Sequence, residues 1–323
     1  MPLNEELSEA FRGVFYPYAS RVIQKVKGQG GRFVYYTSAA TAMGILRDST
    51  MWMRNTLVMN DFSEVEHGLE CVTKAYKSEA GTKLKQFLNA QFDGITEEIA
   101  NTFNAWIPGF RRDTYVLCLS EHVAEDDRYG RLSMWRAYGG NAGVAIVING
   151  GALFRESDAL AAYSMPVAYL DEVGLQEEFN AVADSIGKNA SFLQALGRAG
   201  TKDAIFHMLR YASICTKHPA FKEEQEWRVV SSPALQSSPL VPVDVEVIGG
   251  IPQKVLKIKL EDHPEKGLTG LEPNQLIDRI LIGPCEHSAV IEQALWQTLN
   301  DAGIKDPGSK IFNTGIPLRD NQR

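Results

Sequence analysis

The sequence has few of the patterns that mark metal sites, disulfide frameworks or nucleotide-binding loops. Its 323 residues include only four cysteines, and no two of them form a C-x-x-C pair. Widely spaced cysteines of this kind are typical of reduced, buried thiols. The six histidines show no H-E-x-x-H spacing, and neither a G-x-G-x-x-G motif nor a P-loop is present. These absences disfavour zinc hydrolases, Rossmann dinucleotide-binding proteins and P-loop NTPases, and we expect no bound metal.

The sequence also lacks an excess of basic residues and any long apolar run. Its net charge is -7, so a bulk electrostatic attraction to DNA or RNA is not expected. No apolar run approaches the roughly 20 residues of a membrane-spanning helix. The first residues, MPLNEELSEAF, lack the basic and apolar segments of a signal peptide. With reduced cysteines, this predicts a cytoplasmic protein with no membrane partner.

What is present is a globular composition, with 44% hydrophobic and 23% charged residues. At this length, one large domain or two closely packed lobes are both allowed. The Ser/Pro-rich stretch 231–242 lies between predicted strands, so we interpret it as a surface loop rather than a domain boundary. We therefore expect a single domain over residues 1–323, with an N-terminal helical extension over about residues 1–30.

Strand and helix patterns are mixed along the chain, which predicts an α+β fold. Ser38 stands where a helix-capping residue is expected, directly before the first helix pattern. Aromatic and β-branched runs predict strands over residues 33–37, 51–53, 114–120, 143–148, 165–170, 226–231, 245–248, 255–260 and 279–282. Apolar positions at helical spacing predict helices over residues 39–47, 64–74, about 80–105, 171–187, 190–216 and 288–299.

The segment 221–230 carries the most informative charge pattern. If it enters a strand, Glu224, Glu226 and Arg228 share one face while Trp227 faces the core. Two carboxylates and a guanidinium are costly to bury without partners or a ligand. Two like charges so close are expected to raise the pKa of one carboxyl. A catalytic carboxylate pair and a solvated face with a structural salt bridge both fit this spacing, and spacing alone favours the salt bridge.

Three further clusters combine polar and aromatic residues. They are the strand end Tyr35–Ser38, the segment Ser133–Tyr138 before a glycine-rich turn, and the polar corner Asn60–Glu64. For the first two the ordinary alternative is an aromatic core. For the third it is a helix cap formed by Asp61 or Ser63. Taken singly, each cluster more commonly has this structural role than a role in ligand binding.

Together these clusters resemble the bacterial family known as domain of unknown function 2971. The resemblance covers about residues 32–319 and depends on the order of its motifs. These are Tyr36-Thr37-Ser38, Asn60-Asp61-Phe62-Ser63-Glu64, Cys118-Leu119-Ser120, Ser133-Met134-Trp135-Arg136-Ala137-Tyr138 with Gly143, Lys222 with Glu224-Gln225-Glu226-Trp227-Arg228, Ile282-Gly283-Pro284 and Ile316-Pro317-Leu318-Arg319.

That family is distantly similar to ADP-ribosyltransferases, which bind NAD in a cleft between two small sheets. The resemblance implies a split β-sheet core of the ADP-ribosyltransferase type, with flanking and inserted helices. It implies that NAD is the substrate and that ADP-ribose passes to a protein or nucleic-acid acceptor. Glu226 matches the catalytic glutamate of the superfamily, and Glu224 matches the residue that orients the acceptor.

The resemblance also implies where NAD binds. Arg228 braces the carboxylates or meets a phosphate through its planar fork. The remaining implied contacts are Tyr36, Thr37 and Ser38 for the nucleotide, Ser133, Trp135 and Tyr138 for the nicotinamide side, and the polar corner residues Asn60, Asp61 and Glu64.

The first strand departs from the family pattern in two ways. Tyr35 stands where members often have histidine, and Arg32 lies at the beginning of the strand rather than at its polar end. Two alternatives therefore stay open beside the transferase. One is an NAD glycohydrolase with water as acceptor. The other is a non-catalytic module that binds a nucleotide, a nucleic acid or a partner on the same fold.

Overall fold

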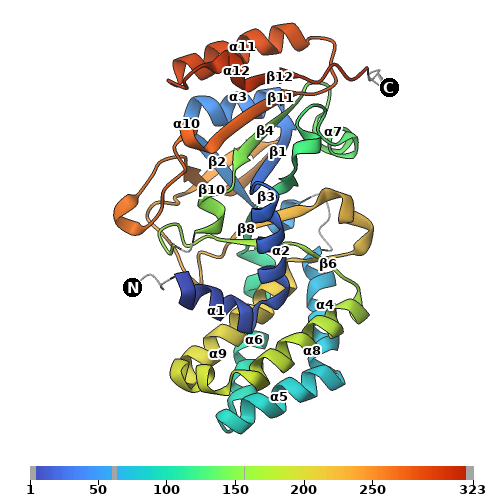
Figure 1. Cartoon of the computed structure of the whole chain (residues 1–323), viewed down its shortest axis with the longest axis vertical. Coiled ribbons are helices and arrows are strands. Elements are labelled where there is room, and N and C mark those ends of the chain that lie inside the picture. Colours follow the sequence, from blue (N-terminus) through green and yellow to red (C-terminus); the bar gives the residue numbers. More distant parts are fainter. Residues whose placement is uncertain (1–4, 60–63, 156, 318–323) are drawn as a thin grey trace.

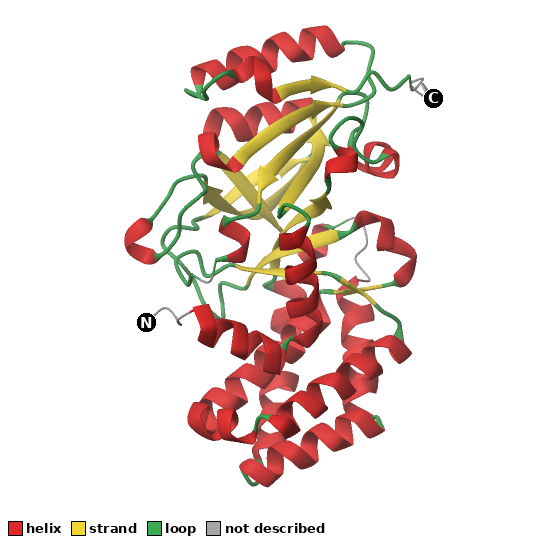
Figure 2. Ribbon diagram, in the orientation of Figure 1, coloured by secondary structure: helices red, strands yellow, loops and turns green. Residues whose placement is uncertain are grey.

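The computed structural model describes residues 5–59, 64–155 and 157–317 (Figure 1). Strands gather toward one end of an elongated molecule and most helices toward the other (Figure 2). The described residues form a ten-stranded mixed sheet and a two-stranded sheet, surrounded by helices. The α+β fold expected from the sequence is thus confirmed.

The large sheet has a main path of eight strands and a short branch. The branch consists of β8 (Glu226–Ser231), which pairs with β3, and β5 (Tyr163–Pro166), which pairs with β8. The main path runs β12 (Ile311–Asn313), β11 (Ile277–Ile282), β4 (Gly143–Asn149), β1 (Arg32–Ser38), β3 (Tyr115–His122), β2 (Thr50–Asn55), β10 (Ile251–Lys259) and β9 (Val243–Ile248). The small sheet pairs β6 (Ala168–Tyr169) with β7 (Thr216–Lys217) in parallel.

The main path opens between β1 and β3. These strands pair only at Arg32, Phe33 and Val34, opposite His122, Glu121 and Ser120. Beyond Val34, β1 continues beside β4 up to Ser38, while β3 continues beside β8 down to Tyr115. The two halves of the sheet therefore diverge from a short paired segment.

Helices cover the sheet at one end and form a bundle at the other. At the sheet end lie α3 (Ala39–Asp48), α7 (Leu132–Tyr138), α10 (Pro273–Leu276), α11 (Ser288–Asp301) and α12 (Pro307–Lys310) (Figure 1). The bundle contains α4 (Glu64–Lys77), α5 (Glu79–Gln91), α6 (Ile95–Arg112), α8 (Glu172–Lys188) and α9 (Ala190–Ile214). The N-terminal helices α1 (Glu5–Phe15) and α2 (Pro17–Gly28) run along the bundle and toward the sheet.

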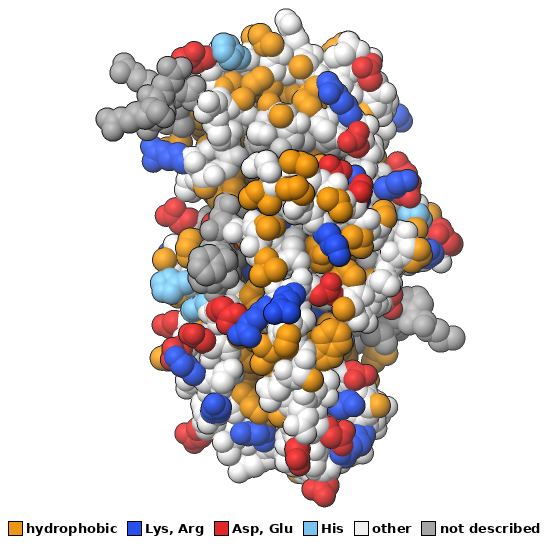
Figure 3. Space-filling view, turned by 180° about the vertical axis from the view of Figure 1, so that it is seen from behind, with side chains coloured by type: hydrophobic (Ala, Val, Ile, Leu, Met, Phe, Trp, Pro, Cys, Tyr) orange, Lys and Arg blue, Asp and Glu red, His pale blue; other side chains and the backbone are white. Residues whose placement is uncertain are grey.

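Two large apolar clusters correspond to the two ends of the molecule, one in the sheet and one in the helical bundle. In the sheet cluster, the fully buried Trp227 ring lies 4.8 Å from Phe33 and 5.9 Å from Phe154, measured between ring centroids. In the bundle cluster, Leu84 and Leu88 of α5 are completely buried. The side of the molecule opposite to Figure 1 shows charged side chains of both signs interspersed, with hydrophobic side chains visible from its upper end through its middle (Figure 3).

Most predicted elements are present, and the exceptions have local causes. The helix expected over residues 80–105 is two helices, because Gly94 adopts a left-handed conformation with φ of 72° between α5 and α6. The strand expected over residues 165–170 is divided between β5 and β6. Ser38 caps α3 as expected, since its hydroxyl accepts a hydrogen bond of 3.2 Å from the Thr41 N–H. Within the described ranges, we find no helix with the length and apolarity needed to cross a bilayer.

Candidate functional site

Two carboxylates meet one lysine where β8 begins. Glu226 is the first residue of β8, whereas Glu224 ends the preceding 3-10 turn, Pro219–Glu224. Between them Gln225 is left-handed, with φ of 43°. Lys217 Nζ lies 2.6 Å from Glu224 Oε2 and 3.2 Å from Glu226 Oε2. The alternation rule of a strand therefore does not apply to Glu224, and the turn brings its carboxylate to the same cation instead.

Arg228 holds Glu226 from the other side. Its Nε donates to Glu226 Oε1 at 2.7 Å, and its Nη2 donates to Oε2 at 3.2 Å. Its Nη1 donates to the backbone carbonyl of Ile214, at the end of α9. The Glu226 backbone N–H donates to the Tyr169 hydroxyl at 2.6 Å. Glu226 is 5% exposed and Arg228 1% exposed, so this ion pair is buried and oriented from β6, β8 and α9.

The two neighbouring cations determine the charge state of Glu226. Burial raises the pKa of its carboxyl, but the Arg228 guanidinium, the Lys217 ammonium and the Cys118 thiol together lower that pKa to about 2. Glu226 is therefore not the carboxyl whose pKa a pair of adjacent acids would raise, because two cations lie against it. The carboxylate is ionised at neutral pH.

Two exposed rings border the ion cluster. The Tyr138 hydroxyl donates to Glu224 Oε1 at 3.3 Å, and Lys217 Nζ lies 4.8 Å from the centroid of the Phe221 ring. Tyr138 is 36% exposed and Phe221 38% exposed. Burial, and then the negative charge of Glu224, raise the pKa of the Tyr138 hydroxyl. Tyr138 therefore remains a neutral hydrogen-bond donor with an accessible ring.

Trp135, on the buried face of α7, packs against Tyr36 of β1 in a small core. Trp135 is 3% exposed, and its ring meets Tyr36 edge-on with centroids 4.9 Å apart. The Trp135 Nε1–H donates to the Tyr129 carbonyl at 2.7 Å. The Tyr36 hydroxyl accepts from the Arg131 N–H at 2.8 Å. A Cβ on Gly283 would stand 2.6 Å from the Trp135 ring, which accounts for the glycine in the Ile282-Gly283-Pro284 motif.

The other expected binding residues have different positions. Thr37 is buried in β1, and Ser38 caps α3. Ser133 is exposed on α7, and Glu64 begins α4. Asn60 and Asp61 lie outside the described residues. The structure thus brings Glu224, Glu226, Arg228 and Tyr138 together, and it places Tyr36 and Trp135 in the packing beside them.

Arg32 belongs to a separate charge network. Its Nη1 lies 2.9 Å from Asp127 Oδ1 and 3.0 Å from Asp278 Oδ2, at the end of β1 that pairs with β3. Asp127 Oδ1 also lies 2.8 Å from His122 Nε2. Arg32 therefore ties together β1, β3 and β11 instead of reaching the polar end of β1.

Sequence reasoning missed Lys217, Tyr169 and Cys118. Tyr169 lies on β6 and Lys217 on β7, two-residue strands that pair in parallel. Such short strands have no detectable periodicity. Cys118 lies opposite Arg228 in the β3–β8 ladder, and it belonged to a recognised motif without an assigned role. In the described part of the chain, no group of three or more His, Cys, Asp or Glu is arranged to hold a metal ion.

Comparison with known proteins gives one match. Residues 134–229 match the model of a family described as a protein of unknown function (DUF2971), which supports the resemblance drawn from the motifs. The matched segment runs from α7 into β8, so it contains Tyr138, Lys217, Glu224, Glu226 and Arg228. No curated protein and no solved structure matches the chain.

Proposed function

We propose that this protein cleaves the nicotinamide–ribose bond of NAD and transfers ADP-ribose to a protein or nucleic-acid acceptor. The observation that carries the proposal is the meeting of Glu224 and Glu226 on Lys217 at the start of β8. In the superfamily that the sequence resembles, a carboxylate pair on a late strand does this chemistry.

The divergence of the large sheet is consistent with a split core of the ADP-ribosyltransferase type. Val34, Ser120 and Glu226 are aligned across β1, β3 and β8. Two residues further along β8, β1 no longer pairs with β3, while Arg228 still pairs with Cys118. Glu226 thus lies beside the point where the two halves of the sheet separate, and this is where the proposal places the ribose.

An ionised Glu226 suits the proposed chemistry. When the ribose–nitrogen bond breaks, nicotinamide leaves with the bonding electron pair and positive charge develops on the ribose. A fixed carboxylate stabilises that charge more strongly in the transition state than in the substrate. The nucleophile of the acceptor then forms the new bond to the ribose and loses its proton. Glu224, which is less deeply buried, is placed to orient this nucleophile and to take the proton.

The surrounding residues take proposed roles that follow from their exposure. We assign the accessible Tyr138 ring to stacking on the nicotinamide, while the buried Trp135 packs α7 against Tyr36 of β1. Arg228 braces Glu226 through two hydrogen bonds, so we assign it to the carboxylate rather than to a phosphate. In the same geometry, water as acceptor would make the protein an NAD glycohydrolase.

A non-catalytic binding module is the second candidate, and one observation favours it. Both oxygens of Glu226 already hydrogen-bond to cations, and the residue is only 5% exposed. In this alternative the ion cluster fixes the shape of the site. Tyr138 and Phe221 would then provide the contact surface for a nucleotide or a partner.

Release of nicotinamide from NAD tests the proposal directly. Purified protein is incubated with NAD, with and without cell protein or RNA, and nicotinamide is measured by chromatography. We expect release by the wild type and a loss of at least about a hundredfold in Glu224→Gln. Glu223→Gln, a change at the exposed neighbouring position, is the matched control and should keep full activity.

Two results would overturn the transferase proposal. If no condition gives nicotinamide while NAD still raises the melting temperature, the binding module is the correct function. If release occurs equally in wild type and Glu224→Gln, the carboxylate pair is not the site of the reaction.

A further inference from the structure

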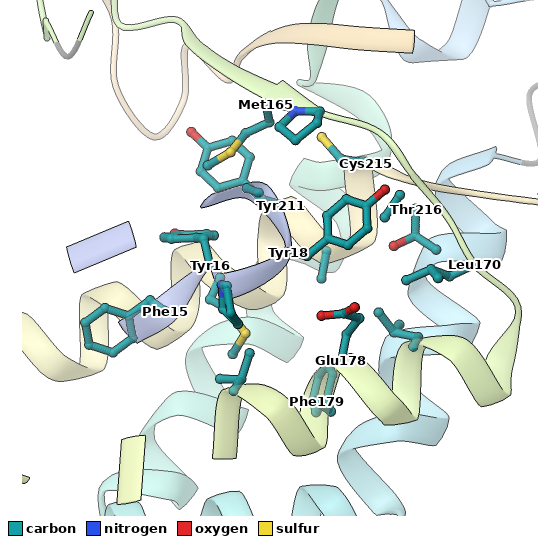
Figure 4. A pocket seen from close by; sticks show the side chains of 18 residues that line it. Phe15, Tyr16, Tyr18, Met165, Leu170, Glu178, Phe179, Tyr211, Cys215 and Thr216 are labelled. Carbon is teal, nitrogen blue, oxygen red and sulfur yellow. The ribbon is translucent and has the colours of Figure 1, made fainter. Parts of the chain in front are cut away.

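A small apolar cavity opens between the N-terminal helices, α8 and α9. Tyr16, Phe179 and Tyr211 are part of its wall (Figure 4). Its volume is about 90 Å³, which is less than the roughly 150 Å³ of a cavity that holds a benzene ring. The cavity is thus too small for a ring-sized ligand, whereas the edge of the large sheet presents a row of exposed apolar side chains.

The edge strand β9 has an exposed apolar face. In the described part of the chain, β9 ends the main path of the sheet and pairs only with β10. Val243, Val245 and Val247 alternate along β9 and are 55%, 62% and 67% exposed. Soluble proteins usually protect their edge strands, because an open edge pairs readily with another extended chain. A row of exposed valines on such an edge therefore marks an interaction surface.

The backbone of these valines points away from β10. The Lys257 N–H donates to the Pro242 carbonyl at 3.1 Å, which fixes the hydrogen-bonding phase of the β9–β10 pair. In an antiparallel pair every second residue bonds to the partner strand, so Asp244 and Glu246 bond to β10. The intervening N–H and carbonyl groups face outward, and of these the Val245 N–H donates to Asp244 Oδ1 at 2.8 Å.

The opposite face of β9 is acidic. Lys257 Nζ lies 2.6 Å from Asp244 Oδ2 and 2.6 Å from Glu246 Oε1, so two carboxylates at the edge share one cation. Arg54, on β2, donates to Gln253 instead of to these acids. Like charges opposite one another destabilise a strand pair, whereas opposite charges stabilise it. The edge therefore favours a basic partner strand. It opposes β9 of a second copy, because the register that pairs all the valines sets acid against acid.

We propose that β9 binds an extended protein segment in which apolar and basic residues alternate. Its apolar side chains lie against Val243, Val245 and Val247, and its basic side chains lie against Asp244 and Glu246. The main chain of the segment extends the sheet, and the alternation of its side chains gives specificity. β2 and β10 separate β9 from β3, so this inference does not depend on the proposed reaction with NAD.

Three short peptides test the proposal. They are the alternating basic peptide TVKVKVT, its acidic counterpart TVEVEVT, and TKVVVKT, which has the composition of the first peptide without its alternation. Binding of each labelled peptide to the full chain is measured by fluorescence anisotropy. We expect TVKVKVT to bind at least about tenfold more tightly than either of the others. Equal affinities, tighter binding of the acidic peptide, or failure of all three to bind would overturn the proposal.

Variants of the edge locate the binding. Val247→Pro removes an outward N–H but no bond to β10, so it should weaken binding of TVKVKVT about tenfold. Val247→Ile keeps that N–H and is the matched control. Asp244→Asn combined with Glu246→Gln should abolish the preference for the basic over the acidic peptide, and it tests the assignment even where Val247→Pro does not fold. Unchanged affinity in folded Val247→Pro, or an unchanged preference in the double variant, would contradict the assignment.

A second copy of the chain is the competing occupant of this edge. Sedimentation velocity of the wild type and of Val247→Pro distinguishes it from a foreign segment. We expect the two proteins to sediment alike, because acids oppose acids when β9 pairs with itself. A larger species that forms in the wild type and is lost in Val247→Pro would overturn the proposal and assign the edge to a second copy.

Discussion

At the scale of single residues, the molecule is organised around a charge-balanced cluster. Two acids, Glu224 and Glu226, face two bases, Lys217 and Arg228, over distances of 2.6–3.2 Å. Replacing a whole buried ion pair with apolar residues is often neutral for stability, whereas removing one partner leaves an uncompensated charge. Because of this asymmetry, comparing single and double variants of the ion pair separates its structural role from a chemical one.

Glu226→Gln should lower the free energy of unfolding by about 3 kcal/mol, because Arg228 keeps its charge in a buried position. The double variant Glu226→Leu/Arg228→Met should recover most of that loss, and under the proposed mechanism neither protein should release nicotinamide. Urea denaturation of both proteins measures the two effects. A double variant as unstable as Glu226→Gln would show that the pair itself stabilises the fold.

Stability should also depend on pH through Glu226. Its pKa is about 2 in the folded protein, against an ordinary value of 4.5. Because the folded value is the lower one, the ionised carboxylate stabilises the fold above pH 4.5, and the contribution is lost as the pH falls from 4.5 toward 2. The full contribution is on the order of 3 kcal/mol, at about 1.4 kcal/mol per pKa unit.

Urea denaturation at several acidic pH values measures this contribution. The difference in stability between wild type and Glu226→Gln should shrink across that acid range and stay constant from pH 5 to pH 8, roughly the range of greatest protein stability. A constant difference at all pH values would mean that Glu226 has an ordinary pKa.

At the scale of elements, two helix glycines differ in what surrounds them. A Cβ on Gly68 in α4 would stand 2.0 Å from the Ser213 carbonyl oxygen of α9, whereas a Cβ on Gly44 in α3 would meet nothing within 4 Å. Gly68→Ala should therefore destabilise the protein by about 2 kcal/mol or more through overpacking. Gly44→Ala should stabilise it by up to about 1 kcal/mol through helix propensity. Thermal unfolding of both variants should show shifts of opposite sign, and a harmless Gly68→Ala would mean that α4 and α9 are less closely packed.

The sequence predicted elements well where one local pattern was sufficient. The alternation in residues 226–231 correctly placed Trp227 in the core and Glu226 with Arg228 on the other face. It failed at Glu224, because the left-handed Gln225 ends a turn there. Lys217 was not predictable, since it reaches the acids through tertiary packing of a two-residue strand after α9. The assignment of residues to NAD binding stays a prediction.

At the scale of the whole molecule, the two large apolar clusters are joined by a smaller apolar cluster and by polar links. The smaller cluster packs Val116 of β3 and Val230 of β8 against Ile214 of α9. Arg228 of β8 binds the Ile214 carbonyl of α9, and the Ala168 N–H donates to the Cys215 carbonyl at 2.7 Å. The Tyr18 hydroxyl of α2 donates to the Val167 carbonyl at 3.2 Å. These links lie close to the ion cluster, so the candidate site stands where the sheet end meets the helical bundle.

Because of this arrangement, the cooperativity of unfolding tests the prediction that the chain forms a single domain. Leu88 in α5 and Leu256 in β10 are almost fully buried in different clusters, and Leu→Ala at either position should cost about 2–5 kcal/mol. If the polar links couple the two ends, calorimetry should show one transition with equal calorimetric and van't Hoff enthalpies, and both variants should lower its midpoint. Two transitions, with Leu88→Ala lowering one and Leu256→Ala the other, would identify two separately folding lobes. Removing the Arg228 link by substitution with Met, together with Glu226→Leu, should then separate the transitions further, because it deletes a deeply buried polar contact between β8 and α9.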